Sequence, residues 1–123
     1  MHMKELSIYE QYDFYVDSFN HIGTFLLSSD LEDIECCIFE EFDSDCTSFF
    51  HKNTLSALLA GNLISENVFF MSLDLAAKFK SLENTPLWNA MSVKSDIHWL
   101  EILTLADKIK SLLNITQGHL YKP

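Results

Sequence analysis

The sequence predicts an all-α fold, a single-domain bundle of five or six helices that takes in residues 1–123. Of these 123 residues 48% are hydrophobic and ten are Phe, which is enough apolar surface for the core of one domain. Only three Gly and two Pro occur, too few for the turns that all-β folds need about every ten residues. Apolar residues instead recur at helical spacing through most of the chain.

Residues 5–27 form the first predicted helix. Its inner side is expected to carry Tyr9, Tyr12, Val16, Phe19, Gly23 and Leu26, which share one face at about 100° per residue. The opposite side carries Glu10, Asp13 and Asp17, so the helix is amphipathic with an acidic outer ridge. Gly23 is a position at which this helix can be interrupted, since Gly costs about 1 kcal/mol relative to Ala in a helix.

The segment "DLEDIECCIFEEFDSDC", residues 30–46, holds eight carboxylates and no basic residue. We expect a helix here, because Ser28, Ser29 and Asp30 are N-cap residues and acids in the first turn suit the helix dipole. The expected apolar stripe consists of Leu31, Ile34, Ile38, Phe42 and Phe49. Across from it lie Glu32, Asp33, Glu40 and Asp43, with Glu35, Glu41 and Asp45 toward its edges. Asp and Ser favour caps and turns, so the helix is expected to end near residues 43–45.

Four further segments complete the predicted bundle. A short helix over residues 53–63 is expected to close at Gly61, and a longer one over 66–84 to begin at the cap Ser65. In the longer helix the main stripe is Val68, Met71, Leu75, Phe79 and Leu82. Pro86 suits the first turn of a short segment over 87–92. Ser95 or Asp96 caps the last helix, with residues 115–123 as an irregular tail.

Charge is distributed unevenly along the chain. Residues 1–50 contain twelve acids and one base, whereas residues 51–123 contain seven Lys and six acids. There is no Arg, the residue best suited to grip phosphate, which argues against direct nucleic-acid binding. The acidic half would instead attract a basic protein. No stretch approaches the roughly 20 apolar residues of a membrane span, and the acidic N-terminus does not resemble a signal peptide.

The cysteines and histidines are the first candidates for chemistry. Cys36, Cys37, Cys46 and His51 could in principle bind zinc. Their spacing contains no CxxC knuckle, and adjacent Cys on a helix point about 100° apart, so we expect structural thiols and no metal. An odd count of three Cys excludes a full disulfide framework and favours a reduced, cytoplasmic chain.

Asp13, Asp17 and His21 also share a helix face, but no partner helix supplies the E-x-x-H pairs of a dimetal bundle. We interpret them as a solvated polar face, and His98 as a capping or surface residue. The sequence has no nucleophile elbow and no Gly-rich phosphate loop. It therefore predicts a protein without cofactor that is not an enzyme.

The segment Ser65–Leu113, with its Leu/Phe helix, central Trp88 and closing "HWLEILTLADKI", is similar to bacterial immunity proteins of contact-dependent growth inhibition systems. The resemblance covers under half of the chain. It implies a cytoplasmic inhibitor that binds a toxin domain, often a nuclease. Because such families diversify quickly, it implies no role for any individual residue.

We therefore expect an immunity protein that binds a basic toxin, either by occupying its phosphate-binding cleft or by blocking access from one side. The alternative is an acidic helical adaptor or regulator, including a nucleic-acid mimic that occupies another basic protein. A small metal-dependent or Cys-dependent enzyme is a third class. The expected partner-binding residues are Glu10, Asp13, Asp17, Glu32, Asp33, Glu40, Glu41, Asp43 and Asp45.

Overall fold

The computed structural model describes residues 6–114 and contains only helices in this part of the chain. The elements are α1 (Ile8–Ser18), η1 (Phe19–His21), η2 (Thr24–Ser28), α2 (Leu31–Ile34), η3 (Glu35–Phe42), α3 (Asp43–Phe49), α4 (Lys52–Ala60), α5 (Glu66–Ser81), α6 (Ala90–Ser95) and α7 (Ile97–Leu112). Because α2, η3 and α3 follow one another without a break, they form one long helix. With that helix counted once, the prediction of an all-α bundle of five or six helices is confirmed. The tail predicted for residues 115–123 lies outside the described residues.

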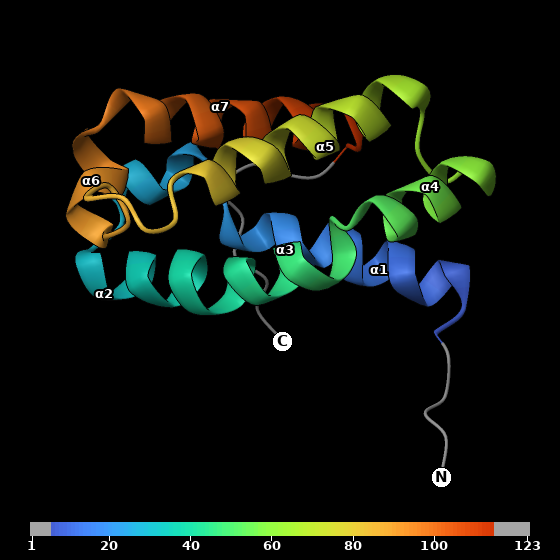
Figure 1. Cartoon of the computed structure of the whole chain (residues 1–123), viewed down its shortest axis with the longest axis horizontal. Coiled ribbons are helices and arrows are strands. Elements are labelled where there is room, and N and C mark those ends of the chain that lie inside the picture. The colour runs from blue at the N-terminus through green and yellow to red at the C-terminus, as the bar shows by residue number, and fades with distance from the viewer. Residues whose placement is uncertain (1–5, 115–123) are drawn as a thin grey trace, which may run out of the picture.

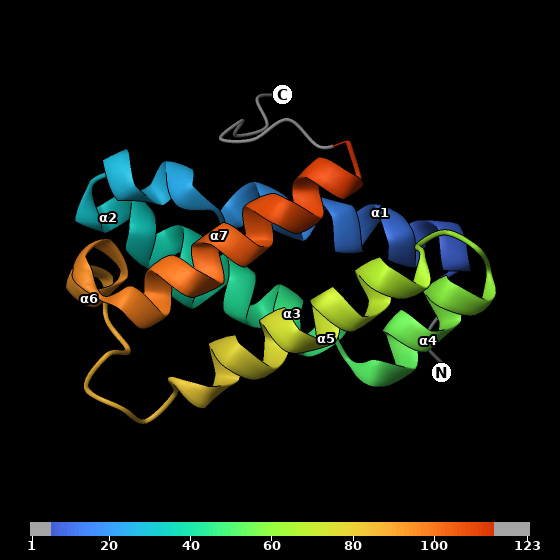
Figure 2. The same cartoon turned by 90° about the horizontal axis from the view of Figure 1, so that it is seen from above.

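The bundle has two layers (Figure 1). One layer contains α1 and the long helix α2–η3–α3, and the other contains α5 and α7, which pack against each other. The short helices close the two ends: α4 contacts α1, α3 and α5, whereas α6 contacts α2 and α7. Seen from above, α5 and α7 run diagonally over the first layer (Figure 2). The acidic half of the sequence thus forms one side of the molecule.

Aromatic rings fill the space between the layers. Phe79 of α5 lies at the centre, with ring centroids 4.9 Å from Phe42, 5.0 Å from Trp88 and 5.9 Å from Trp99. The Tyr15 hydroxyl and the Ser72 hydroxyl form a buried hydrogen bond of 2.6 Å between α1 and α5. Burial raises the pKa of Tyr15, and the bond satisfies a polar group that would otherwise be costly to bury. α5 therefore lies at the centre of the core.

The long helix contains a π-helical segment that the sequence analysis did not predict. Its buried residues are Ile34, Ile38, Phe42, Cys46 and, just after its end, Phe50, at a constant spacing of four. In an α-helix each four-residue step overshoots a full turn by about 40°. A π turn, closed by i→i+5 hydrogen bonds, is wider, so the same step falls short. The π geometry of η3 (Glu35–Phe42), followed by the α geometry of α3 (Asp43–Phe49), therefore keeps all five side chains on the core side.

This register corrects two predictions about the acidic segment. The helix does not end at residues 43–45 but continues to Phe49, because Cys46 and Phe50 still reach the core. Leu31, predicted in the apolar stripe, is 43% exposed, and Phe49 is only partly buried. The cap itself is confirmed: the Asp30 carboxylate accepts a hydrogen bond of 2.8 Å from the Asp33 N–H.

The predicted helix over residues 5–27 is wrong in its second half. α1 ends at Ser18, and a break at Ile22 and Gly23 separates two short 3₁₀ turns. Gly23 has a φ of 156°, and a Cβ there would lie 2.6 Å from Asp107 Oδ1. The chain therefore leaves the helix in order to pass close to α7. The inner face differs as well, since Tyr9 is 68% exposed and Tyr15 is fully buried.

The remaining boundaries are close to the predicted ones, except around Pro86. Ser65 and Asp96 cap α5 and α7 through hydrogen bonds from Val68 N–H (3.1 Å) and His98 N–H (2.8 Å). Residues 82–89 form a turn, so Pro86 does not begin a helix and α6 starts only at Ala90.

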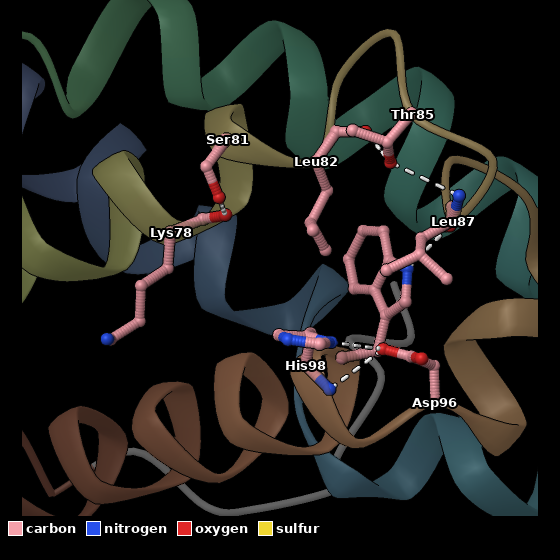
Figure 3. A network of polar contacts seen from close by, with 8 residues as sticks. Lys78, Ser81, Leu82, Thr85, Leu87, Asp96 and His98 are labelled. Carbon is pink, nitrogen blue, oxygen red and sulfur yellow. Dashed lines mark hydrogen bonds and ion pairs between the residues drawn. The ribbon is translucent and has the colours of Figure 1, made fainter.

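Side-chain hydrogen bonds hold this turn against the start of α7 (Figure 3). The Thr85 hydroxyl donates to Leu82 C=O (2.6 Å) and accepts from Leu87 N–H (3.2 Å). The Trp99 indole N–H then donates to Leu87 C=O (2.7 Å). These bonds satisfy backbone groups that leave the regular helices.

Candidate acidic interface

The acids predicted to bind a partner lie on the layer formed by α1 and α2–η3–α3 (Figure 1). Residues 6–50 contain eleven acids and no Lys, whereas residues 51–114 contain six of each. Seven of the nine predicted residues are exposed: Glu10, Asp13, Asp17, Glu32, Asp33, Glu40 and Glu41. Asp43 and Asp45 are partly buried. The charge imbalance of the sequence is therefore a charge imbalance between two sides of the molecule.

His21 is the point at which acids from different elements meet. Its Nδ1 lies 3.4 Å from Asp45 Oδ2, a contact longer than a typical hydrogen bond but within range of an ion pair. The interaction with Asp45 raises the pKa of His21, partial burial opposes the shift, and the charges of Asp17 and Glu41 add to it. The structure thus brings together three of the predicted acids around a histidine that the sequence analysis assigned to a solvated face.

The other predicted acids are not all gathered at one point. Glu10 accepts a hydrogen bond of 2.9 Å from Ser7 N–H and so completes a capping box at the start of α1. Asp33, Glu40 and Glu41 lie close enough to Cys36 to influence its thiol. The candidate interface is therefore an extended charged surface along the long helix, with Glu10 at its far margin.

The three thiols are poorly suited to nucleophilic chemistry. Desolvation, followed by the charges of Glu40 and Glu41, raises the pKa of the exposed Cys36. Burial raises the pKa of Cys37 to about 11 and that of Cys46 to about 12. Because the thiolate is the nucleophile, neutral pH leaves these groups almost entirely protonated.

The residues considered as metal ligands are not brought together. Cys36 is exposed, Cys46 is buried, and His51 caps α4 by accepting a hydrogen bond of 3.1 Å from Asn53 N–H. Within residues 6–114 no group of three His, Cys, Asp or Glu side chains is arranged to hold a metal ion. None of the helices described there combines the length and apolar character needed to cross a membrane.

A buried polar cluster on α7 was missed by the sequence analysis. Lys110 is 1% exposed, its Nζ lies 3.8 Å from Asp107 Oδ1 and 5.0 Å from the centre of the Phe25 ring. Asp107 also accepts hydrogen bonds from the Thr24 N–H (3.3 Å) and hydroxyl. Burial lowers the pKa of Lys110, and the charge of Asp107 opposes this shift. A helical wheel predicts the burial of Lys110, because this residue falls between Leu103 and Ala106 on the apolar side.

α5 and α7 lie on the side of the bundle opposite to the acidic layer (Figure 2). Residues of these two helices line a groove. Its lining residues are Asp74, Lys78, Ile97, Leu100, Glu101, Thr104, Leu105 and Lys108. Ile97 is 73% exposed and Leu100 is 43% exposed. The groove combines exposed apolar side chains with two acids and two bases.

Comparison of the chain with protein-family models, with curated proteins and with solved structures finds no match in any of the three.

Proposed function

We propose that this chain is a cytoplasmic immunity protein that binds and neutralises a basic toxin domain, such as a nuclease, through the acidic layer. The observation that supports this proposal is the segregation of charge: eleven acids and no Lys within residues 6–50, on one side of the bundle. Like charges crowded on one side destabilise the folded state by self-repulsion. A basic partner would neutralise these charges and so relieve their repulsion on binding. The same charges would increase its rate of association.

The long helix is the central element of the proposed interface. Its residues 31–49 span about 28 Å at 1.5 Å per residue, enough to cross a substantial part of a standard interface. The core residues at spacing four anchor the helix on its inner side. Glu40 is exposed and Asp43 is partly buried at its rim. Acids held on a rigid, packed element lose little freedom on binding, which favours affinity.

The test is neutralisation of a toxin by the wild-type chain and by charge-reversal variants. A gene for an immunity protein should lie next to a large toxin gene, and the C-terminal domain of that toxin should be lethal without this chain. Glu40→Lys with Asp43→Lys should slow association with the toxin strongly, and the loss should be smaller at high salt, where the wild-type field is screened. Stability should change by under about 0.5 kcal/mol per exposed site.

The matched control is Glu83→Lys with Glu101→Lys, which makes the same change in net charge outside the acidic layer. Equal toxin binding by both double variants would refute the proposed surface. A second outcome is that the gene has no neighbouring toxin gene, while the chain binds a different basic protein and Glu40→Lys weakens that binding. In that case the protein is an acidic adaptor or a nucleic-acid mimic.

A further inference from the structure

The outer face of α7 has a pattern that neither the core nor the proposed toxin interface uses. Ile97, Glu101, Thr104, Lys108 and Leu112 follow one another at helical spacing on the side away from the core, together with the half-buried Leu105. Ile97 is 73% exposed and Leu112 is 51% exposed. In soluble proteins, large apolar side chains exposed among charged residues on one helix face indicate an interaction surface.

The order of these residues is self-complementary. In an antiparallel pair of identical helices related by a two-fold axis, each residue meets the residue at the same distance on the other side of the axis. With the axis between Thr104 and Leu105, Glu101 lies opposite Lys108 of the second copy, and Ile97 lies opposite Leu112. Each of these contacts forms twice. Glu101 and Lys108 then form contacts of opposite charge across the axis, and Ile97 and Leu112 form apolar contacts.

α5 extends this face without adding net charge. Asp74 and Lys78 line the groove beside α7 and form an ion pair of 3.8 Å with each other. The groove as a whole therefore carries Asp74, Lys78, Glu101 and Lys108, two acids and two bases. The acidic layer on the opposite side would repel its own copy, so the α5/α7 face is the side on which two copies can meet.

We propose that the α5/α7 face is a homodimer interface in which α7 packs antiparallel against α7 of a second copy. α7 has 16 residues and spans about 24 Å. With helices about 10 Å apart, α5 and α7 together present a face of roughly 500 Å². A standard stable interface buries about 800 Å² per partner. A face of this size lies at the low end of specific interfaces, which corresponds to a reversible dimer. The dimer does not depend on the proposed toxin binding, because it uses the opposite side of the bundle.

Sedimentation velocity of the purified chain from about 1 to about 500 µM tests the proposal, with the weight-average mass rising toward that of two chains. Glu101→Lys places Lys opposite Lys108 twice, and Lys108→Glu places Glu opposite Glu101 twice. Each should weaken the dimer about tenfold, since two attractive contacts become repulsive. The double variant restores opposite charges and should recover the wild-type affinity. Circular dichroism checks that each variant remains helical.

Ile97→Lys supplies a second, apolar test, and should leave the chain monomeric while its thermal unfolding is nearly unchanged, because this side chain contributes little to the core. The matched control is Glu40→Lys with Asp43→Lys, which should leave dimerisation intact. A wild-type chain that stays monomeric up to the highest concentration would overturn the proposal, even if another protein covers this face. If Glu101→Lys with Lys108→Glu does not recover the wild-type dimer affinity, the antiparallel register is wrong. If Glu40→Lys with Asp43→Lys abolishes the dimer, the copies associate head to tail and the proposal is overturned.

Discussion

Replacing Phe79 with Ala would remove the ring that joins the two layers. Phe79 is fully buried and lies edge-on to Phe42 of the long helix at an interplanar angle of 88°. Its ring also contacts Trp88 in the turn after α5 and Trp99 of α7. The side chain therefore meets residues from three separate elements, which cannot all move inward to fill the space it would leave.

The magnitude follows from burial and from these ring contacts. Phe→Ala in a core costs about 3–5 kcal/mol, with the larger values where the surroundings cannot collapse. Each aromatic pair contributes about 0.5–1.5 kcal/mol beyond its buried area. With three such pairs lost we expect a decrease of about 4–5 kcal/mol in the free energy of unfolding. This is a large part of the ~5–15 kcal/mol that a typical domain has.

Urea denaturation followed by circular dichroism measures this change. At a slope of about 2 kcal/mol per molar urea, the midpoint should fall by about 2 M. Phe70→Ala is the matched control, because Phe70 lies on the same helix but is 59% exposed, and it should cost under about 1 kcal/mol. A loss below about 1 kcal/mol for Phe79→Ala, or equal losses for both variants, would mean that α5 is peripheral and that the packing described above is wrong.

Three further predictions concern single positions. Brief alkylation of the native chain should modify Cys36 faster than Cys37, because Cys36 is exposed and Cys37 is half-buried; equal rates would contradict the register of the π segment. The NMR titration of His21 should give a pKa above its usual value, and Asp45→Asn should lower it. Because the folded-state pKa is raised, the stabilisation should be complete below about pH 6.5 and lost as pH rises through the folded pKa; a flat pH profile would exclude the pair. Gly23→Ala should destabilise the fold by more than about 1 kcal/mol in the same urea assay, because a Cβ there meets the buried Lys–Asp pair of α7; an unchanged midpoint would contradict this.

Local signals in the sequence predicted much of the fold. The caps Asp30, Ser65 and Asp96 could be identified because an N-cap depends only on a short polar side chain and the next three residues. The buried face of α5 could be predicted because its apolar residues recur at i, i+3 and i+4. Helix type and approximate length can thus be predicted from short stretches of sequence.

What the sequence did not predict depends on distant contacts. A spacing of four residues from Ile34 to Phe50 suits neither an ideal α-helix nor a heptad. The π turns are explained by packing of the long helix against η1, α1 and α5. The break at Gly23 likewise serves a contact with Asp107, which is 84 positions away in the chain. Local helix propensity alone therefore predicts neither the π segment nor the break at Gly23.

The candidate acidic interface could likewise be predicted only in part. Exposure of Glu32, Asp33 and Glu40 follows from their position opposite the apolar stripe, and the structure agrees. The contact of Asp45 with His21 joins two elements 24 positions apart and could not be read from periodicity. Partial burial of Asp43 follows from the continuation of the helix to Phe49, which was also not predicted.

The placement of charge connects the two proposals. The acidic layer and the α5/α7 face lie on opposite sides of the bundle (Figure 1), so a dimer formed through α7 would leave both acidic layers facing outward. Such a dimer would carry two toxin-binding surfaces, and binding at one would not block the other. It would also keep the two acidic layers far apart, since more than one bundle thickness separates them. At that separation, well beyond the Debye length of about 8 Å at physiological salt, their mutual repulsion is screened. The same segregation of charge that makes self-association of the acidic side unfavourable therefore leaves the other side free to associate.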